Sequence, residues 1–303
     1  MGAFSVSLFR RLKLRAAGTS FFARGIFFYH ILVYDVIKKD ECEMKNEPEY
    51  LYHYTSLESL ALILKNKTIR LNPLDKMDDI DESCLGNYSN AAKYVFVSSW
   101  TEDKRESIPF WSMYTSNMSG VRIKLHIRPF RKYSYVSTPN LTVTPGTQFY
   151  IPQNQITGND YLITPTEGVF VTKVKYTSNQ EELYPKIGIK TDSSMRLDMN
   201  EVGKYKRSEW DFQKEWRYRM LCFPMSMESL NTKSGAAICM QRIESGYDMQ
   251  KKYIDLDIEE SYFKDIEIMR GPKMSEGEKV LLDILVKTFC PTAKIINSEL
   301  KIR

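Results

Sequence analysis

The clearest order of apolar and polar positions in the chain predicts a strand, a helix and a second strand in succession. The first strand is the apolar and aromatic run Leu51–Tyr54, which contains His53. After it, four aliphatic residues recur at the spacing that gives a helix one buried stripe: Leu57, Leu60, Ile63 and Leu64. Thr55 and Glu58 have the spacing of a capping box at the helix start, and Thr68–Leu71 returns as a short strand. His53 therefore lies at a strand-to-helix junction, where a side chain faces a cleft more often than a core.

Two later segments alternate apolar and polar residues with a period of two, which predicts half-buried strands. In the first, basic residues and a histidine occupy the polar positions: Arg122, Lys124, His126 and Arg128. In the second, residues 214–223, one face carries Glu215, Arg217 and Arg219, and the other carries Trp216, Tyr218, Met220 and Cys222. We expect His126 to point to solvent with its basic neighbours. We expect the charged face of the second strand to be a place for chemistry.

The C-terminal residues repeat the order of strand, capped helix and strand. Ile266–Met269 and Ala293–Leu300 are the predicted strands, and Ser275 with Glu278 has the spacing of a second capping box. The helix between them carries an apolar stripe: Val280, Leu281, Ile284, Leu285 and Val286. Two strands joined by a helix of this length favour parallel pairing at the edge of a sheet. The sequence therefore predicts an α+β fold of mixed β-sheets with flanking helices and a C-terminal βαβ unit.

Length and composition are sufficient for one large domain with a full core. The chain has 303 residues, of which 43% are hydrophobic. Its formal net charge is +5, but residues 1–43 hold seven Lys and Arg against four Asp and Glu. The remainder is close to neutral, so overall charge argues only weakly for nucleic-acid binding. We expect a single domain over residues 45–303, with residues 1–43 as an N-terminal extension outside the fold and Met44 as the natural start.

The extension contains a mostly apolar stretch, Phe21–Ile37, which Arg24, His30 and Asp35 interrupt. It is too short and too charged for a membrane span, so we expect no stable membrane insertion. A signal or transit-like segment is the alternative interpretation.

Cysteine usage is typical of a reducing compartment. The five cysteines lie far apart and form no CxxC pair, and the three histidines are also scattered. We therefore expect free thiols, a cytoplasmic protein and no metal site of histidine and cysteine ligands.

An acidic loop, Asp75–Glu82, is the remaining candidate for a metal site. We expect it to be followed by a helix through residues 91–92 and a buried strand at Tyr94–Trp100. A metal-dependent hydrolase would use the loop's carboxylates: Asp78, Asp79, Asp81 and Glu82. Contiguous acids more often form a solvated loop, so we predict no metal.

Several of these motifs together resemble the DUF2971 family of uncharacterised bacterial proteins, over about residue 49 to the C-terminus. The matching positions are Leu51-Tyr-His-Tyr-Thr-Ser-Leu57, Phe110-Trp-Ser-Met-Tyr114 with Gly120-Val121, Val174-Lys-Tyr176, and Lys206 to Arg217 with Trp210 and Glu215. The tail, Ile266–Leu300, also resembles the end of the family. Asp78–Glu82 departs from the family's usual loop by lacking an Asn and a Pro.

A more distant similarity connects the Tyr-His-Tyr-Thr strand and its short helix to ADP-ribosyltransferase-like domains. The resemblance implies NAD as substrate, His53 as a ligand of the NAD ribose and Glu215 as the catalytic carboxylate. Tyr114, or Tyr54, would pack on nicotinamide. The NAD-binding set that this implies is His53, Tyr54, Thr55, Tyr114, Arg217 and Arg219.

The residue types fit such chemistry. Breaking the bond between nicotinamide and ribose passes through an oxocarbenium-like state, which a nearby carboxylate stabilises. Arg217 and Arg219 would keep Glu215 ionised and could pair with diphosphate oxygens. We expect a transferase or NAD glycohydrolase, such as a defence or toxin-type effector with a protein or nucleic acid as acceptor. On this hypothesis, Glu215→Ala abolishes activity without unfolding the protein.

Two other interpretations stay open. His53 can be a packed, satisfied residue, and Glu215 with its arginines can be a solvated ladder of ion pairs. Alternatively, the protein is a nucleotide- or nucleic-acid-binding sensor with a basic strand face: Arg122, Lys124, His126, Arg128, Arg131 and Lys132. The enzyme hypothesis requires His53 and Glu215 in one cleft, with Tyr54 or Tyr114 lining it.

Overall fold

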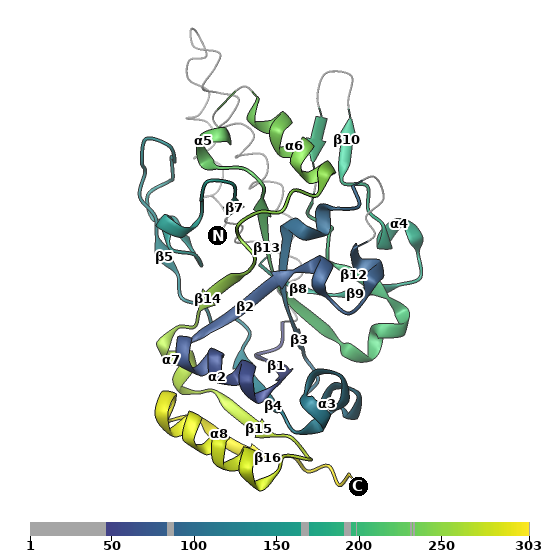
Figure 1. Ribbon diagram of the computed structural model, residues 1–303, viewed down its shortest axis with the longest axis vertical. Helices are drawn as coiled ribbons and strands as arrows, with labels where there is room; N and C mark the ends of the chain where they lie inside the picture. Colours follow the sequence, from purple (N-terminus) through teal and green to yellow (C-terminus); the bar gives the residue numbers. More distant parts are fainter. Residues whose placement is uncertain are drawn as a thin grey trace, which may run out of the picture.

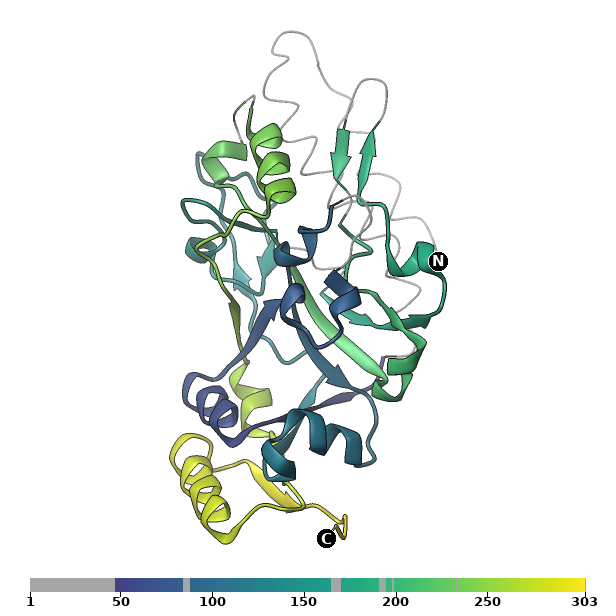
Figure 2. The same ribbon diagram turned by 45° about the vertical axis from the view of Figure 1, so that its right-hand side comes forward.

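A computed structural model describes residues 47–83, 88–164, 170–190, 195–197, 199–230, 232 and 234–302. Within these residues the fold is α+β, with a ten-stranded mixed sheet, three two-stranded sheets and several helices. The C-terminal unit lies at one end of the molecule and α6 at the other (Figures 1 and 2). The expected N-terminal extension, residues 1–43, falls outside the described residues.

Strands and helices alternate irregularly along the chain. The strands are β1 (Tyr50–Thr55), β2 (Thr68–Pro73), β3 (Val95–Thr101), β4 (Val121–His126), β5 (Tyr133–Ser134), β6 (Gln148–Phe149), β7 (Leu162–Thr164), β8 (Val171–Lys173), β9 (Lys175–Thr177), β10 (Gly188–Lys190), β11 (Met195–Leu197), β12 (Tyr205–Arg207), β13 (Glu215–Phe223), β14 (Ile254–Asp257), β15 (Glu267–Arg270) and β16 (Lys294–Asn297). The α-helices are α2 (Leu57–Asn66), α3 (Ile108–Tyr114), α4 (Gln180–Leu183), α5 (Met227–Leu230), α6 (Gly235–Ser245), α7 (Glu260–Lys264) and α8 (Glu276–Phe289). Short 3₁₀ helices are η2 (Leu74–Lys76), η3 (Ile80–Ser83), η4 (Ala91–Tyr94), η5 (Ser116–Met118), η6 (Gln153–Gln155) and η7 (Ser208–Gln213).

The large sheet divides at β3. Its order is β14-β2-β3-β1-β4-β15-β16, and β13 pairs with β3, β7 and β8. Along its whole length, one edge of β3 pairs antiparallel with β13. The other edge pairs with β2 at Phe96 and Val97 and with β1 at Thr101. Residues 98–100 therefore lie where β1 and β2 diverge, and backbone polar groups at such a place are open to side chains or a ligand.

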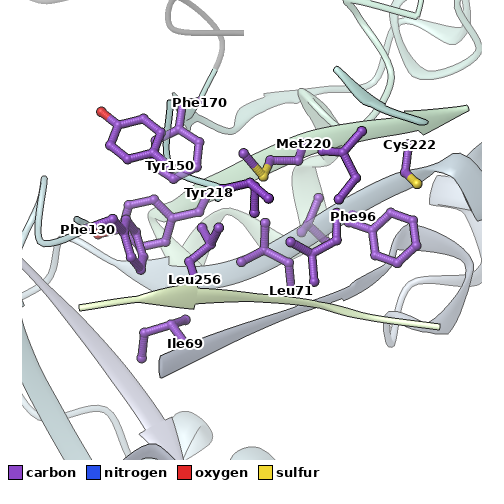
Figure 3. Packing of buried hydrophobic residues seen from close by; sticks show 14 of the residues in the cluster. Ile69, Leu71, Phe96, Phe130, Tyr150, Phe170, Tyr218, Met220, Cys222 and Leu256 are labelled. Carbon is purple, nitrogen blue, oxygen red and sulfur yellow. The ribbon is translucent and has the colours of Figure 1, made fainter. Parts of the chain in front are cut away.

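The main core lies between β13 on one side and β2 with β14 on the other. Leu71 and Leu256 point toward Tyr218 and Met220 (Figure 3). The predicted face of Trp216, Tyr218, Met220 and Cys222 is thus buried, as expected for an apolar strand face. The opposite face of β13 is also buried. Arg217 and Arg219 are 0% and 2% exposed, so the interpretation of a solvated ladder of ion pairs is wrong.

The C-terminal βαβ unit is confirmed. β15 and β16 pair in parallel at the end of the sheet, and α8 connects them. The helix begins with a complete capping box of Ser275 and Glu278. The predicted stripe is only partly correct. Leu282 and Val286 are buried, and Leu285 packs against the core, whereas three residues of the predicted stripe are more than half exposed: Val280, Leu281 and Ile284. Apolar residues outnumber the buried positions on α8, so sequence periodicity alone placed the stripe incorrectly.

The first helix also forms where expected, but its cap differs. Ser56, not Thr55, accepts a hydrogen bond from the N–H of Ser59 (3.2 Å) and is the N-cap of α2. Thr55 is the last residue of β1. The predicted helix through residues 91–92 is only the 3₁₀ turn η4, because β3 begins directly after it at Val95. In the described part of the chain, no helix has the length and apolar character that crossing a membrane requires.

Candidate functional site

A cavity of about 430 Å³ opens where β1 and β2 diverge from β3. Its volume is in the range of small-molecule sites. His53 and Tyr54 come from β1, Glu215 and Arg217 come from β13, and Tyr114 ends α3; all five line this cavity. The structure therefore brings the proposed histidine and carboxylate into one cleft, from strands separated by about half of the chain.

His53 of β1 bridges to β3 at the place where β1 and β2 diverge. Its Nδ1 lies 2.9 Å from the carbonyl oxygen of Ser99 on β3, and its ring packs against Trp100 with centroids 4.9 Å apart. A carbonyl only accepts, so Nδ1 carries the proton and the neutral ring leaves Nε2 as an acceptor. Burial lowers the pKa of His53, against a smaller opposing effect of the Ser99 hydrogen bond. A neutral imidazole at this position can accept a hydrogen bond from a ligand hydroxyl.

His53 should stay neutral, as the Nδ1–H tautomer, at a pH where an ordinary histidine is about half protonated, roughly pH 6.5. The reason is that burial disfavours the imidazolium form. Nitrogen-15 NMR of the imidazole rings measures both protonation and tautomer, with the resonance assigned by its loss in His53→Asn. A doubly protonated ring, or an Nε2–H tautomer, at that pH would contradict the geometry.

Glu215 is 3% exposed and is held by two cations. Arg217 donates from Nε to Oε1 (2.6 Å) and from Nη2 to Oε2 (3.2 Å), and Lys206 donates from Nζ to Oε2 (3.1 Å). Burial by itself would raise the pKa of Glu215, but the charges of Arg217 and Lys206 outweigh it and lower the pKa to about 2. Glu215 is thus an ionised carboxylate in a fixed orientation. Removing it leaves two cations buried together, so we no longer expect Glu215→Ala to leave the fold intact.

Arg217 is committed to protein partners. Besides Glu215, it donates to the carbonyl of Gly203 (3.0 Å) and to Oε1 of Glu82 (2.6 Å). Arg219 is not among the residues that line the cavity, and it donates to backbone carbonyls of the covering segment: Met199, Asn200 and Val202. The prediction that these two arginines bind diphosphate oxygens therefore does not fit the structure. Their donors hold the segment that covers the charged face of β13.

A chain of hydrogen bonds extends from Glu215 to Tyr114. Lys206 donates to Oε1 of Gln213 (2.8 Å), and Gln213 Nε2 donates to the Tyr114 hydroxyl (2.7 Å). Burial, with the charge of Asp78 nearby, raises the pKa of Tyr114, so the phenol stays protonated. The sequence pattern assigned no role at the site to Lys206 or Gln213. A lysine and a glutamine outside the strand pattern carry no periodic signal.

The other two NAD-binding candidates line the cavity in different ways. Tyr54 is 4% exposed, and its ring packs against Phe110 and Trp111, with centroids 4.9 and 4.8 Å away. That packing leaves Tyr114, which is half-buried, as the better aromatic surface for a ligand. Thr55 is buried at the end of β1 and also lines the cavity.

The basic strand face proposed for a sensor module is largely neutralised. Arg122 is 5% exposed, and its guanidinium donates to the Lys104 carbonyl (3.1 Å). Arg128 pairs with Glu47 (2.6 Å). The expectation that His126 points to solvent is wrong: its ring stacks on Tyr262 with centroids 4.6 Å apart. The alternation predicted correctly which side chains of this strand share a face of the sheet, but Tyr262 of α7 packs against His126 on that face.

Three residues of the acidic loop line the cavity, Lys76, Met77 and Asp78, and Asp78 is the carboxylate among them. Glu82 pairs with Arg217, and Asp81 pairs with Arg207 at 2.8 Å. Within the described ranges, no group of three or more His, Cys, Asp or Glu side chains is arranged to hold a metal ion. The described cysteines, Cys222, Cys239 and Cys290, are buried free thiols.

Comparison of the chain with protein-family models, with known proteins and with solved structures found no match, so the geometry of this cavity carries the functional argument.

Proposed function

We propose that the protein is an NAD-using enzyme, an ADP-ribosyltransferase-like transferase or NAD glycohydrolase. One observation carries the proposal: His53 and Glu215 line the same cavity, together with Tyr114, although they come from β1 and β13. This is the arrangement that the resemblance to ADP-ribosyltransferase-like domains requires. The resemblance to the DUF2971 family remains part of the same proposal.

In the proposed reaction, the bond between nicotinamide and C1′ of the ribose breaks. The electron pair leaves with nicotinamide, which departs as a neutral molecule, and positive charge develops on the ribose. Glu215 is ionised and rigid, so it needs no reorganisation to stabilise this charge. A nucleophile, water or an acceptor hydroxyl, amine or base, then bonds to C1′ and releases its proton to solvent.

His53 and Tyr114 would orient the substrate. The Nε2 lone pair of His53 accepts a hydrogen bond from a ribose hydroxyl, and the ring of Tyr114 supplies a surface for nicotinamide. Holding the ribose beside Glu215 in this way would reduce the entropy cost of reaching the transition state.

His53→Ala should weaken NAD binding and slow nicotinamide release by about tenfold, the effect of losing one hydrogen bond of 1 to 2 kcal/mol. Release of nicotinamide from NAD by the purified chain, with and without cell extract as an acceptor source, measures this effect. His126→Ala is the matched control, because His126 is not among the residues that line the cavity and its ring stacks on Tyr262.

Failure of the folded wild-type protein to release nicotinamide or to label any macromolecule would refute the proposal. Equal loss in His53→Ala and His126→Ala would show a general effect on the fold. The alternative, a nucleotide-binding sensor at the same cavity, would appear as NAD binding that depends on His53 without nicotinamide release.

A further inference from the structure

A second cavity, of about 370 Å³, adjoins the first. The two cavities share three lining residues: Asn72, Lys76 and Met77. These residues lie at the end of β2 and in the turn that follows it. A ligand longer than one cavity can therefore pass over Lys76 from the first cavity into the second.

The second cavity has an excess of positive charge. Its lining includes four lysines and two aspartates: Lys76, Lys93, Lys251, Lys252, Asp75 and Asp248. The side chain of Lys76 is 71% exposed, and its ion pair with Asp75 is long at 3.9 Å. A concave surface with this balance favours anions, and a weakly paired, exposed lysine loses little when it changes partner.

Among the described residues that line the first cavity, the cations other than Lys76 are already held by protein partners. Arg70 donates to both carboxylate oxygens of Asp255 (2.8 and 2.9 Å). Arg217 and Lys206 are held by Glu215, Gln213 and Glu82, and both are almost fully buried. Arg219 is not among the lining residues and donates to the backbone carbonyls of Met199 and Val202. For a dinucleotide whose nicotinamide ribose lies beside Glu215, the weakly paired cation of the first cavity is therefore Lys76, which also lines the second cavity.

We propose that the second cavity binds the diphosphate of the dinucleotide, with Lys76 at the passage between the cavities and Lys251 within the second. This inference rests on the proposed function. It assigns a binding site to the diphosphate of the substrate, which Arg217 and Arg219 do not bind. The recognised group is a nucleoside diphosphate. Its affinity decreases as salt concentration rises, because the contacts are between exposed charges.

The probe for this site is ADP, titrated calorimetrically into the full-length protein. Lys76→Ala and Lys251→Ala should each weaken ADP binding by about tenfold, the effect of losing one charge-assisted hydrogen bond. Lys264→Ala is the matched control, since Lys264 is an exposed lysine of α7 that lines neither cavity. ADP should also compete with NAD in the nicotinamide-release assay.

The outcomes separate this inference from the proposed function. ADP binding that depends on both lysines, without any nicotinamide release, supports the anion site and refutes only the proposed reaction. If the protein releases nicotinamide but neither lysine variant changes the ADP affinity or the KM for NAD, the inference is overturned and the proposed function stands. ADP that binds without competing with NAD also overturns it, because the phosphate site would then belong to a separate ligand.

Discussion

Arg217→Met should lower the free energy of unfolding by about 3–5 kcal/mol, the cost of leaving buried charges without their partner. Arg217 is 0% exposed and joins Glu215, Glu82 and the Gly203 carbonyl in one hydrogen-bonded group. Methionine fills a similar volume but donates nothing, so the carboxyl groups of Glu215 and Glu82 and the Gly203 carbonyl each lose a hydrogen-bond donor. Because domains are stable by only about 5–15 kcal/mol, this change should remove a large part of the stability. Urea unfolding followed by tryptophan fluorescence measures it.

An exposed arginine gives the matched control. Arg105 pairs with Asp103 at 3.2 Å, but its side chain is 81% exposed. Arg105→Met should leave the urea midpoint of the wild type nearly unchanged, because solvent screens exposed ion pairs. If Arg217→Met also leaves the urea midpoint nearly unchanged, the hydrogen-bonded group around Glu215 does not stabilise the fold as described. If Arg217→Met does not fold, Arg217→Lys keeps the charge with fewer donors and should give an intermediate loss.

Glu215→Gln should reduce nicotinamide release from NAD by about 100- to 1,000-fold, the usual effect of removing one preorganised electrostatic group. Glutamine keeps the size and some hydrogen bonds of the side chain but removes its negative charge. The pKa of Glu215 is lowered to about 2, so the wild-type carboxylate is charged at every pH at which the enzyme would work. The pH profile should therefore contain no step from Glu215 between pH 4.5 and pH 8.

Glu82→Gln separates this effect from a change in the fold. Glu82 is buried and contacts the same Arg217, yet it is not among the residues that line the cavity. Burial raises the pKa of Glu82, so a neutral side chain there is better tolerated than at Glu215. Near-UV circular dichroism confirms that each variant is folded before kinetics are measured. Equal losses of activity in Glu82→Gln and Glu215→Gln would assign the effect to the shared arginine and not to a carboxylate at the ribose.

The local sequence pattern predicted the helices and strands of this fold well, but it predicted less well which of their faces are buried. The alternation in residues 214–223 predicted β13 and the division of its two faces. It could not predict that the charged face is buried, because the covering carbonyls belong to residues 199–203, which show no regular pattern. The same limit explains His126, whose stacking partner Tyr262 is distant in sequence.

Sequence alone determined the strand that carries His53, the helix after it, the charged strand of Glu215 and the parallel C-terminal unit. Each of these depends on residues close together in the chain, where periodicity and capping act. Only the tertiary structure decided that His53 and Glu215 line one cavity and that Lys206 and Gln213 complete the group around Glu215. It also decided that Arg217 and Arg219 are committed to the protein itself. The physical reason is that burial and ion pairing depend on which distant segments meet, and a single sequence does not record those contacts.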